Sequence, residues 1–317
     1  MTSPADGVDE AYVARPGVDK RSIVADASRL LWGLVRSARP RQWAKNVLVF
    51  AAPAAAGVLL QPRPLARTLG AFGLFCLAAS GVYFFNDIAD VVEDRRHPRK
   101  RFRPIAAGIV PVPLAMVTAL GLLGGSVVGG WFVLGSAFAA VVAVYVALTI
   151  AYSLWLKRIA VVDLAGVAAG FVLRAIAGGV ATGVAISSWF LIVASFGSLF
   201  VVAGKRHAEH ADLGDNRVET RLVLAQYSLA YLRYVRFIAS SVAIVAYCLW
   251  AFQEAAEGGG VWSELSIVPF VLGILRYALL LEAGHGEAPE EIVLSDRPLQ
   301  VFGALWVVVF LGAVYVG

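Results

Sequence analysis

The sequence has little charge and almost no cysteine, and each shortage excludes a class of protein. Only 15% of the 317 residues are charged, whereas soluble domains carry about 25%. The two cysteines, Cys76 and Cys248, both fall inside apolar segments, so a disulfide framework is not expected. The first 18 residues are polar and acidic. They lack the apolar stretch of a cleaved signal peptide, which we therefore do not expect.

Long apolar segments are abundant instead. Hydrophobic residues make up 59% of the chain, and the mean hydropathy is +0.75. A helix that crosses a bilayer needs about 20 mainly apolar residues. These properties predict an all-α polytopic membrane protein embedded in the lipid bilayer. We expect nine transmembrane helices, at about 44–61, 67–86, 112–131, 133–153, 160–181, 187–204, 234–252, 262–280 and 298–316.

A shorter amphipathic segment precedes these helices. Residues 19–38 place apolar side chains on one face of a helix among basic residues. This pattern favours a helix that lies on the membrane surface, and a simple polar tail is the alternative. The domain organisation we predict is a polar tail (1–18), an interfacial helix (19–38) and one transmembrane domain (39–317).

The distribution of Lys and Arg predicts the orientation of the chain. If the N-terminus is cytoplasmic, the cytoplasmic segments hold 24 Lys and Arg residues and the opposite side holds two, Arg63 and Arg67. The positive-inside rule therefore places the N-terminus in the cytoplasm. The basic residues that give the pI of about 9.3 are accounted for by this asymmetry and by attraction to anionic lipids or substrates. A nucleic-acid partner is therefore not expected.

Four oxygen-bearing side chains follow the second predicted span: Asn86, Asp87, Asp90 and Asp94. At about 100° per residue they share one face of a helix at its cytoplasmic end. Like charges at this spacing repel each other unless a cation lies between them. Carboxylate oxygens with room for water and phosphate favour Mg²⁺, so the pattern predicts a Mg²⁺ site shared with a substrate phosphate. An ordinary solvated helix end is the alternative.

Basic residues follow at once, with six Lys and Arg between Arg95 and Arg103. Two more cytoplasmic helix ends carry similar residues, in the stretches YSLWLKR (152–158) and GKRHAEHAD (204–212). A diphosphate substrate requires a metal flanked by cations, because both neutralise the departing charge. Topology signals are the alternative for any single cation. Arg174 lies inside a predicted span, where an arginine usually faces a cavity or a partner.

These motifs resemble a known family. NDxxDxxxD (86–94) and YxxxxKR (152–158) are similar to motifs of the UbiA superfamily of intramembrane prenyltransferases. The stretches RPRQWAKN (39–46), HPRKRFRPIAAG (97–108), LRAIAGG (173–179) and GKRHAEH (204–210) resemble one branch, which transfers phosphoribose to polyprenyl phosphates. The similarity extends over nearly the whole chain from Ser37 onward.

The resemblance implies a UbiA-type bundle in the plasma membrane. It also implies transfer of 5-phosphoribose from phosphoribosyl diphosphate (PRPP) to a polyprenyl phosphate such as decaprenyl phosphate, in a pathway that supplies arabinose to the cell wall. Homo-oligomers, including trimers, are implied as well. Asp87, Asp90 and Asp94 become the catalytic, Mg²⁺-binding residues. The substrate-binding residues are Lys45, Asn86, Arg95, Lys100, Arg101, Arg103, Tyr152, Lys157, Arg158, Arg174, Lys205 and Arg206.

The chain departs from the wider superfamily in one stretch. Typical members have a second Asp-rich motif after the sixth helix, where this chain has KRHAEHAD. The change argues against a second Mg²⁺ site and favours a substrate with more phosphates, which Lys205 and Arg206 would bind. Two alternatives remain at this point. One is a prenyltransferase that joins a prenyl diphosphate to an aromatic acceptor, and the other is a membrane transporter.

Overall fold

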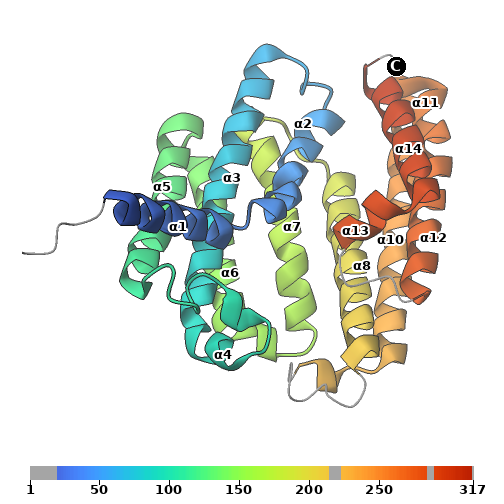
Figure 1. Ribbon diagram of the computed structural model, residues 1–317. Coiled ribbons are helices and arrows are strands. Elements are labelled where there is room, and N and C mark those ends of the chain that lie inside the picture. Colours follow the sequence, from blue (N-terminus) through green and yellow to red (C-terminus); the bar gives the residue numbers. More distant parts are fainter. Residues whose placement is uncertain (1–19, 214–222, 284–288, 316–317) are drawn as a thin grey trace, which may run out of the picture.

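The computed structural model describes residues 20–213, 223–283 and 289–315, which form helices and no strand (Figure 1). The predicted tail, residues 1–18, lies outside them. The elements are α1 (Lys20–Ala38), η1 (Pro40–Phe50), α2 (Ala51–Ala55), α3 (Pro62–Ala89), α4 (Val91–Arg96), η2 (Lys100–Phe102), α5 (Val112–Leu134), α6 (Ser136–Leu154), η3 (Leu156–Arg158), α7 (Val162–Thr182), α8 (Ser188–Leu213), η5 (Leu224–Gln226), α10 (Leu229–Glu254), η6 (Ala255–Gly259), α11 (Gly260–Leu265), α12 (Ile267–Glu282), α13 (Pro289–Ser295) and α14 (Arg297–Tyr315).

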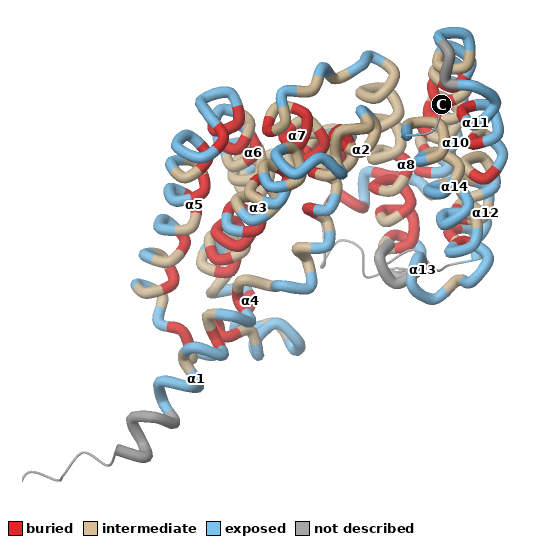
Figure 2. Tube along the Cα trace, turned by 90° about the horizontal axis from the view of Figure 1, so that it is seen from above, coloured by how far each residue is buried: buried red, intermediate tan, exposed pale blue. Residues whose placement is uncertain are grey.

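Eight stretches among the described residues are long and apolar enough to cross a membrane. They are α3, α5, α6, α7, α8, α10 with η6, α11 with α12, and α14, so eight of the nine predicted spans correspond to such stretches. Their outward faces are exposed and apolar, as on α5 and α14 (Figure 2). Phe132 is 83% exposed and Val308 is 66% exposed. Large exposed apolar faces are what a lipid environment covers.

The first predicted span, 44–61, is not confirmed. Its residues form the 3₁₀ helix η1 and the five-residue helix α2, followed by a turn at Gly57 with φ of +69°. Pro53 lacks a backbone N–H, and Pro62 and Pro64 open the next helix, so the apolar run cannot continue as one α-helix. Apolar content predicted one continuous helix here, and the segment instead forms two short helices.

The broken segment packs against α7 at unusually close range. A Cβ atom added to Gly178 would lie 1.8 Å from the carbonyl oxygen of Val49 in η1. The next residue, Gly179, would meet the side chain of Ile186 at 2.7 Å. Glycine is therefore required here for the backbones to approach each other. This contact fixes η1 against the C-terminal part of α7.

Gly178→Ala is expected to destabilise the protein by about 3 kcal/mol, because the new methyl group collides with backbone that cannot move without displacing η1. Gly124→Ala is the matched control, since its Cβ would meet nothing within 4 Å and the residue lies in the exposed part of α5. Thermal unfolding of the two variants in detergent measures the difference. Equal midpoints would show that η1 does not pack on Gly178.

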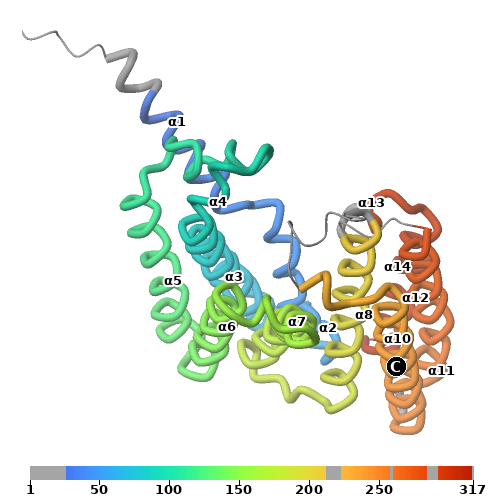
Figure 3. Tube along the Cα trace, turned by 90° about the horizontal axis from the view of Figure 1, so that it is seen from below, coloured from blue at the N-terminus to red at the C-terminus, as the bar shows by residue number. Residues whose placement is uncertain are grey.

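The helices follow a curved path around α3. Seen from below, α5, α6, α7 and α8 succeed one another along the curve, with α3 inside it (Figure 3). The helices α10, α11, α12 and α14 form a separate group beside α8 (Figures 1 and 3). A buried cluster that includes Phe75, Phe138 and Tyr145 joins α3, α6 and α7. Two further buried clusters join α7 and α8 to α10, and join α8 and α10 to α12, α13 and α14, so the core extends over both halves of the chain.

Arg67 ties three helices together at the end of the bundle opposite α4. Its Nε donates to the carbonyl of Ala181 near the end of α7, and its Nη2 donates to the carbonyl of Leu134 at 3.1 Å at the end of α5. A cation is favourable at helix C-termini, where carbonyls lack partners within the helix. This contact accounts for one of the two basic residues on the predicted outer side.

Most of the segment predicted at 19–38 forms α1, which passes in front of α5 in Figure 1 and ends beside α3. Leu30 and Leu34 pack on the buried cluster around Phe84 and Ile105. Other apolar side chains of α1 stay exposed, including Leu31 at 63%, and Trp32 and Val35 at 50% and 54%. Residues 20–38 are helical, whereas an amphipathic helix at the membrane surface stays a prediction.

Candidate active site

The acidic residues lie where α3 ends and α4 begins. Asp87 is in the last turn of α3, Asp90 joins the two helices, and Asp94 is in α4. Backbone bonds from Asp90 N to Asn86 O and from Asp94 N to Asp90 O continue the helical path through the junction. Asp87 and Asp94 are buried, at 2% and 1% exposure, while the side chain of Asp90 is 36% exposed. The predicted grouping at one helix end is therefore present.

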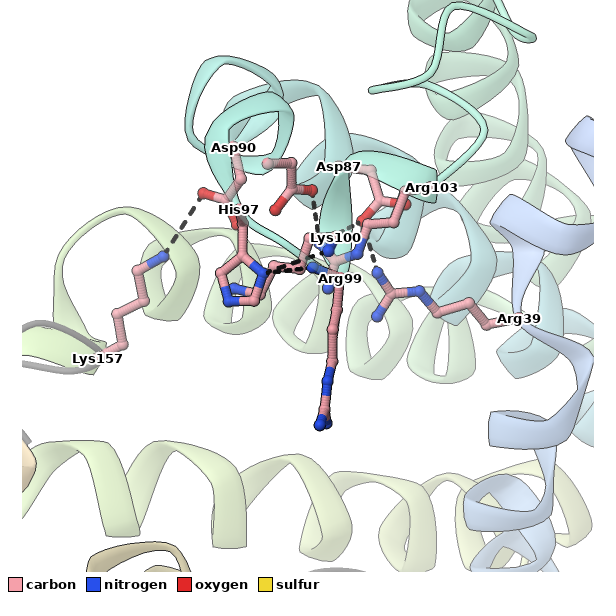
Figure 4. A network of polar contacts seen from close by, with 9 residues as sticks. Arg39, Asp87, Asp90, His97, Arg99, Lys100, Arg103 and Lys157 are labelled. Atoms are coloured by element: carbon pink, nitrogen blue, oxygen red, sulfur yellow. Dashed lines mark hydrogen bonds and ion pairs between the residues drawn. The ribbon is translucent and has the colours of Figure 1, made fainter. Parts of the chain in front are cut away.

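Two arginines neutralise the buried carboxylates (Figure 4). Arg103 Nη1 contacts Asp87 Oδ1 at 3.2 Å and Asp94 Oδ2 at 2.7 Å, so it bridges the pair. Arg39 Nη2 donates to Asp87 Oδ1 at 2.5 Å, and its guanidinium lies 4.9 Å from the ring centre of Tyr83. Charge-assisted bonds of this kind are strong. They offset the repulsion between the two carboxylates.

The third aspartate faces a different cation. Lys157 Nζ lies 3.9 Å from Asp90 Oδ1, and both side chains are about one third exposed. Lys157 belongs to η3, which follows α6, so the second motif reaches the first as predicted (Figure 4). A pair at this distance and exposure contributes little to stability. Asp90 is thus the most accessible of the three carboxylates.

A pocket of about 310 Å³ opens beside Asp87. Its lining combines Asp87, Phe102 and Pro104 with five basic residues: Arg36, Arg39, Arg99, Lys100 and Arg103. So many cations around one small space favour a ligand with several negative charges, such as a phosphorylated molecule. The pocket is where the predicted acidic and basic motifs meet.

The basic loop after α4 is held in place by its own side chains. The ring Nδ1 of His97 accepts hydrogen bonds from the backbone N–H groups of Arg99 and Lys100, at 3.2 and 3.3 Å. Arg95 Nε donates to the carbonyl of Ala106 at 3.2 Å, so this predicted ligand residue braces the loop. Arg101 is exposed and lies over the ring of Phe102.

The oxygen donors at this helix end suit a hard divalent cation. Mg²⁺ prefers carboxylate and amide oxygens together with water and phosphate. Asn86 adds a buried Oδ1 that has no hydrogen-bond partner. Within the described part of the chain, however, no three His, Cys, Asp or Glu side chains are grouped closely enough to hold a metal by themselves. The donor chemistry therefore fits Mg²⁺, with Arg103 lying between two of the donors.

The two basic residues predicted at the end of α8 have different surroundings. Lys205 is 40% exposed and lies 4.0 Å from Glu209. Arg206 is 4% exposed, and its nitrogens donate to Asp163, Glu209 and the hydroxyl of Tyr152 at 2.8 to 3.0 Å. Arg206 therefore faces protein acceptors on all sides, and its predicted contact with a phosphate has no support in this arrangement.

Arg174 also faces the protein interior. It donates to Asn46 Oδ1 at 2.8 Å, to the hydroxyl of Tyr145 at 2.8 Å and to the carbonyl of Gly170. Asn46 in turn donates to Cys76, which precedes Asp87 by three turns of α3, about 16 Å. Arg174 thus fixes η1 to α7 and is not brought together with the aspartates. Of the remaining predicted residues, Lys45 is half-buried in η1 and Arg158 is exposed in η3.

Two cations of the pocket, Arg36 and Arg39, were not predicted as site residues, and Arg99 was predicted only as a member of the basic stretch 95–103. Arg39 follows α1 in a left-handed conformation with φ of 52°, and this turn directs the chain into η1. The stretch RPRQWAKN (39–46) indicated this region only through its resemblance to a family. Nothing in the spacing of residues predicts that Arg39 pairs with Asp87, 48 positions later.

Comparison with known proteins identifies the family. The model of the UbiA prenyltransferase family matches residues 47–295. The chain belongs to this family. It is 44% identical over 90% of its length to a protein of Corynebacterium glutamicum named decaprenyl-phosphate phosphoribosyltransferase, of which the match covers 87%. Proteins with the same name from Mycobacterium tuberculosis (44% identity, covering 92% of this chain and 97% of the relative) and Mycolicibacterium smegmatis (43%, covering 90% and 93%) are similar as well.

Solved structures support the fold of this UbiA family member. The structure of a UbiA homolog from Archaeoglobus fulgidus bound to DMAPP and Mg²⁺ aligns with a TM-score of 0.66 and 16% identity, covering 90% of this chain and 99% of the homolog. A second structure of that homolog, bound to GPP and Mg²⁺, has the same TM-score and covers 89% of this chain. At this identity the likeness shows the fold alone. The predicted UbiA-type helical bundle is confirmed.

Proposed function

We propose that this protein transfers 5-phosphoribose from PRPP to a polyprenyl phosphate, with release of diphosphate. The observation that carries the proposal is the acidic end of α3 beside a pocket with five cations. Such a pocket suits a donor that brings three phosphates and an acceptor that brings a fourth. Relatives at 43–44% identity, named decaprenyl-phosphate phosphoribosyltransferase, support the transfer of phosphoribose to a polyprenyl phosphate.

Asp87, Asp90 and Asp94 are the residues that would hold Mg²⁺, with Asn86 beside them. When bound, the metal supplies positive charge to the diphosphate oxygens. The residues proposed to bind phosphate oxygens are half-buried or exposed, and each has a cationic group or a hydroxyl. They are Arg39, Lys100, Arg101, Arg103, Tyr152, Lys157, Arg158 and Lys205. Two of them, Arg39 and Arg103, contact carboxylates before any substrate arrives. Phosphate oxygens of the donor offer these guanidinium groups an alternative set of acceptors.

The chemistry requires no strong base from the protein. The bond between ribose C1 and the diphosphate oxygen breaks, and its electron pair leaves with the diphosphate. An oxygen of the lipid phosphate, already anionic near neutral pH, attacks C1 from the opposite face and forms the new bond, so the anomeric centre inverts. The chain contributes position and charge: its cations hold both phosphate groups and stabilise the negative charge of the leaving group.

A second candidate function is the transfer of a prenyl group from a prenyl diphosphate to an aromatic acceptor. The observation that favours it is the likeness of fold to a UbiA homolog solved with DMAPP or GPP. A prenyl diphosphate brings two phosphates, which leaves more of the five cations without a substrate anion. The transporter alternative has no support from the family membership.

The product identifies the reaction. Purified protein incubated with Mg²⁺, PRPP and a polyprenyl phosphate is expected to yield a phosphoribosyl lipid, detected by mass spectrometry of the organic phase. The anomeric configuration at C1 should be inverted relative to PRPP. Absence of this lipid from reactions in which the protein is folded would contradict the proposal.

Lys205→Ala is expected to raise the KM of PRPP or of the lipid about 5- to 150-fold, which corresponds to about 1–3 kcal/mol for a hydrogen bond to a charged group. Lys205 is 40% exposed, and Glu209 is the acid next to it. Stability should change little, because an exposed pair contributes little. Steady-state kinetics with each substrate varied in turn measures the effect. Unchanged KM and kcat would make Lys205 a topology signal only.

The active site is placed on the cytoplasmic side of the plasma membrane, with the N-terminus on the same side. α1 is proposed to lie at the membrane surface, since Leu31, Trp32 and Val35 are exposed on it next to basic residues. PRPP is a soluble phosphorylated metabolite and does not cross lipid, which is consistent with this side. We also propose that the protein forms a homo-oligomer, of which a trimer is one form.

Labelling of introduced cysteines tests the orientation. Arg99→Cys places a thiol in the exposed basic loop, and Gly258→Cys places one beyond the end of α10. In intact cells an impermeant thiol reagent is expected to label position 258 and not position 99, because Lys and Arg gather on the cytoplasmic side. Labelling of position 99 alone would reverse the orientation.

A further inference from the structure

A buried polar network joins α7, α8 and the segment before α10, outside the pocket described above. Its centre is the ion pair between Arg206 and Asp163, whose side chains are 4% and 0% exposed. Arg206 Nε donates to Asp163 Oδ2 at 2.8 Å, and Arg206 Nη1 donates to Glu209 at 2.8 Å. Neither Asp163 nor Arg206 lines the basic pocket.

One end of the network reaches Tyr152. Arg206 Nη2 donates to the Tyr152 hydroxyl at 3.0 Å. The ring of Tyr152 lies against α7 at Gly166, where an added Cβ would be 3.0 Å from the ring. The hydroxyl and the ring are therefore both held. Tyr152 is the first residue of the motif that also carries Lys157 and Arg158.

The other end reaches the turn between η3 and α7. The Tyr227 hydroxyl donates to Asp163 Oδ1 and accepts a hydrogen bond from the backbone N–H of Val161 at 2.6 Å. Burial raises the pKa of Tyr227, and the hydrogen bond to Asp163 acts in the same direction, so the hydroxyl keeps its proton. Val161 has φ of 69°, a conformation that β-branched residues rarely adopt. Tyr227 thus holds a strained turn.

The strained turn sets the position of the basic residues before it. η3 spans Leu156–Arg158, three residues before Val161, and Lys157 reaches to within 3.9 Å of Asp90. Strain of this kind persists only where the surroundings fix it, and it gathers near functional sites. The two ends of the network therefore hold the motif 152–158 from both sides: one end contacts Tyr152, and the other contacts Val161, which follows the motif.

We propose that Arg206, Asp163 and Tyr227 are positioning residues, which orient Tyr152 and the η3 turn toward Asp90 and bind no substrate themselves. A buried ion pair is a weak source of net stability, because desolvation of both charges offsets their attraction. Its effect here is on geometry: the planar guanidinium fixes three acceptors at once, which a lysine cannot do. The two basic residues of the stretch GKRHAEH would thereby have different roles: Lys205 faces the substrate, and Arg206 faces Tyr152.

A double-mutant cycle between Arg206 and Tyr152 tests this inference, which rests on the proposed function only for the choice of substrates. The variants are Arg206→Lys, Tyr152→Phe and the combination, assayed for kcat/KM per mole of folded protein. Each single variant is expected to lose about 10- to 100-fold in kcat/KM. If Arg206 acts through the Tyr152 hydroxyl, the combination should be within about 3-fold of Tyr152→Phe alone, because coupled residues are not additive.

Tyr227→Phe provides a milder test, since it removes one hydroxyl and keeps the ring. We expect it to lower kcat/KM about 10-fold. Tyr231→Phe is the matched control, because its ring stacks on that of Tyr227 at 5.8 Å while its hydroxyl makes none of the bonds described here. The control should stay within about 2-fold of the wild type. Thermal midpoints of all variants, measured in detergent, separate kinetic effects from loss of folding.

The outcomes are distinct. Multiplicative losses for Arg206→Lys and Tyr152→Phe would overturn the inference, because Arg206 would then act independently, either on a phosphate or on the fold. A lower thermal midpoint for Tyr227→Phe with unchanged kcat/KM would overturn it as well. If the wild type does not act on PRPP and polyprenyl phosphate, the proposed function fails. The cycle can then be measured with whichever substrate pair the wild type uses.

Discussion

Asp90→Asn is expected to lower kcat/KM at least about 100-fold while leaving the protein as stable as the wild type. The substitution keeps the size of the side chain and removes one negative charge from the site assigned to Mg²⁺. Loss of a group that stabilises the departing diphosphate corresponds to about 3 kcal/mol in the transition state. Stability should hold, because the carboxylate is 36% exposed and pairs with Lys157 only at 3.9 Å.

Asp87→Asn provides the comparison that makes this result informative. Asp87 is 2% exposed and accepts bonds from both Arg39 and Arg103, so its loss should reduce activity and stability together. Steady-state rates at saturating Mg²⁺ and thermal midpoints measure both effects. Near-normal turnover of Asp90→Asn would remove Asp90 from the proposed metal site.

Arg103→Ala is expected to be the most damaging change of a basic residue. Asp94, 1% exposed, would lose the cation that bridges it to Asp87, which should destabilise the protein by about 3 kcal/mol. Loss of a cation that faces the pocket should also lower kcat/KM about 100-fold. Arg96→Ala, in the exposed last turn of α4, is the control and should change neither quantity.

Mg²⁺ gives the Arg103 prediction a second readout that does not depend on activity. With the guanidinium removed, the two buried carboxylates have less positive charge nearby, so binding of the ion should stabilise the variant more than the wild type. Thermal midpoints of Arg103→Ala and of the wild type, measured with and without Mg²⁺, test this. If Mg²⁺ shifts the thermal midpoint equally in the two proteins, Arg103 does not affect binding of the metal.

The parts of the fold that the sequence predicted depend on local pattern. Eight spans correspond to long apolar runs, and the acidic face of Asp87, Asp90 and Asp94 follows from helical spacing at one helix end. The segment 44–61 was different. It has the hydropathy of a span, but Pro53 and the turn at Gly57 break it, and Gly178 lets it pack against α7. The hydropathy of the segment does not predict these turns and contacts.

The pairing of charges could not be predicted in the same way. Arg39 and Asp87 are 48 positions apart, and Arg206 and Asp163 are 43 apart, so only the packing of the helices brings them together. The sequence indicated Arg206 as a phosphate ligand because it lies next to Lys205 in a basic stretch. Neighbours on a helix point about 100° apart, and this separation directs one residue into the protein and leaves the other exposed.

The central claim is that the donor is PRPP, and a comparison of two substrate pairs tests it most directly. Release of diphosphate by the purified protein is measured with PRPP plus a polyprenyl phosphate, and in parallel with a prenyl diphosphate plus 4-hydroxybenzoate. Each pair is assayed with Mg²⁺ and with the ion removed by a chelator. We predict Mg²⁺-dependent release with the first pair and none above background with the second. Release with the second pair alone would contradict the account and establish an aromatic prenyltransferase.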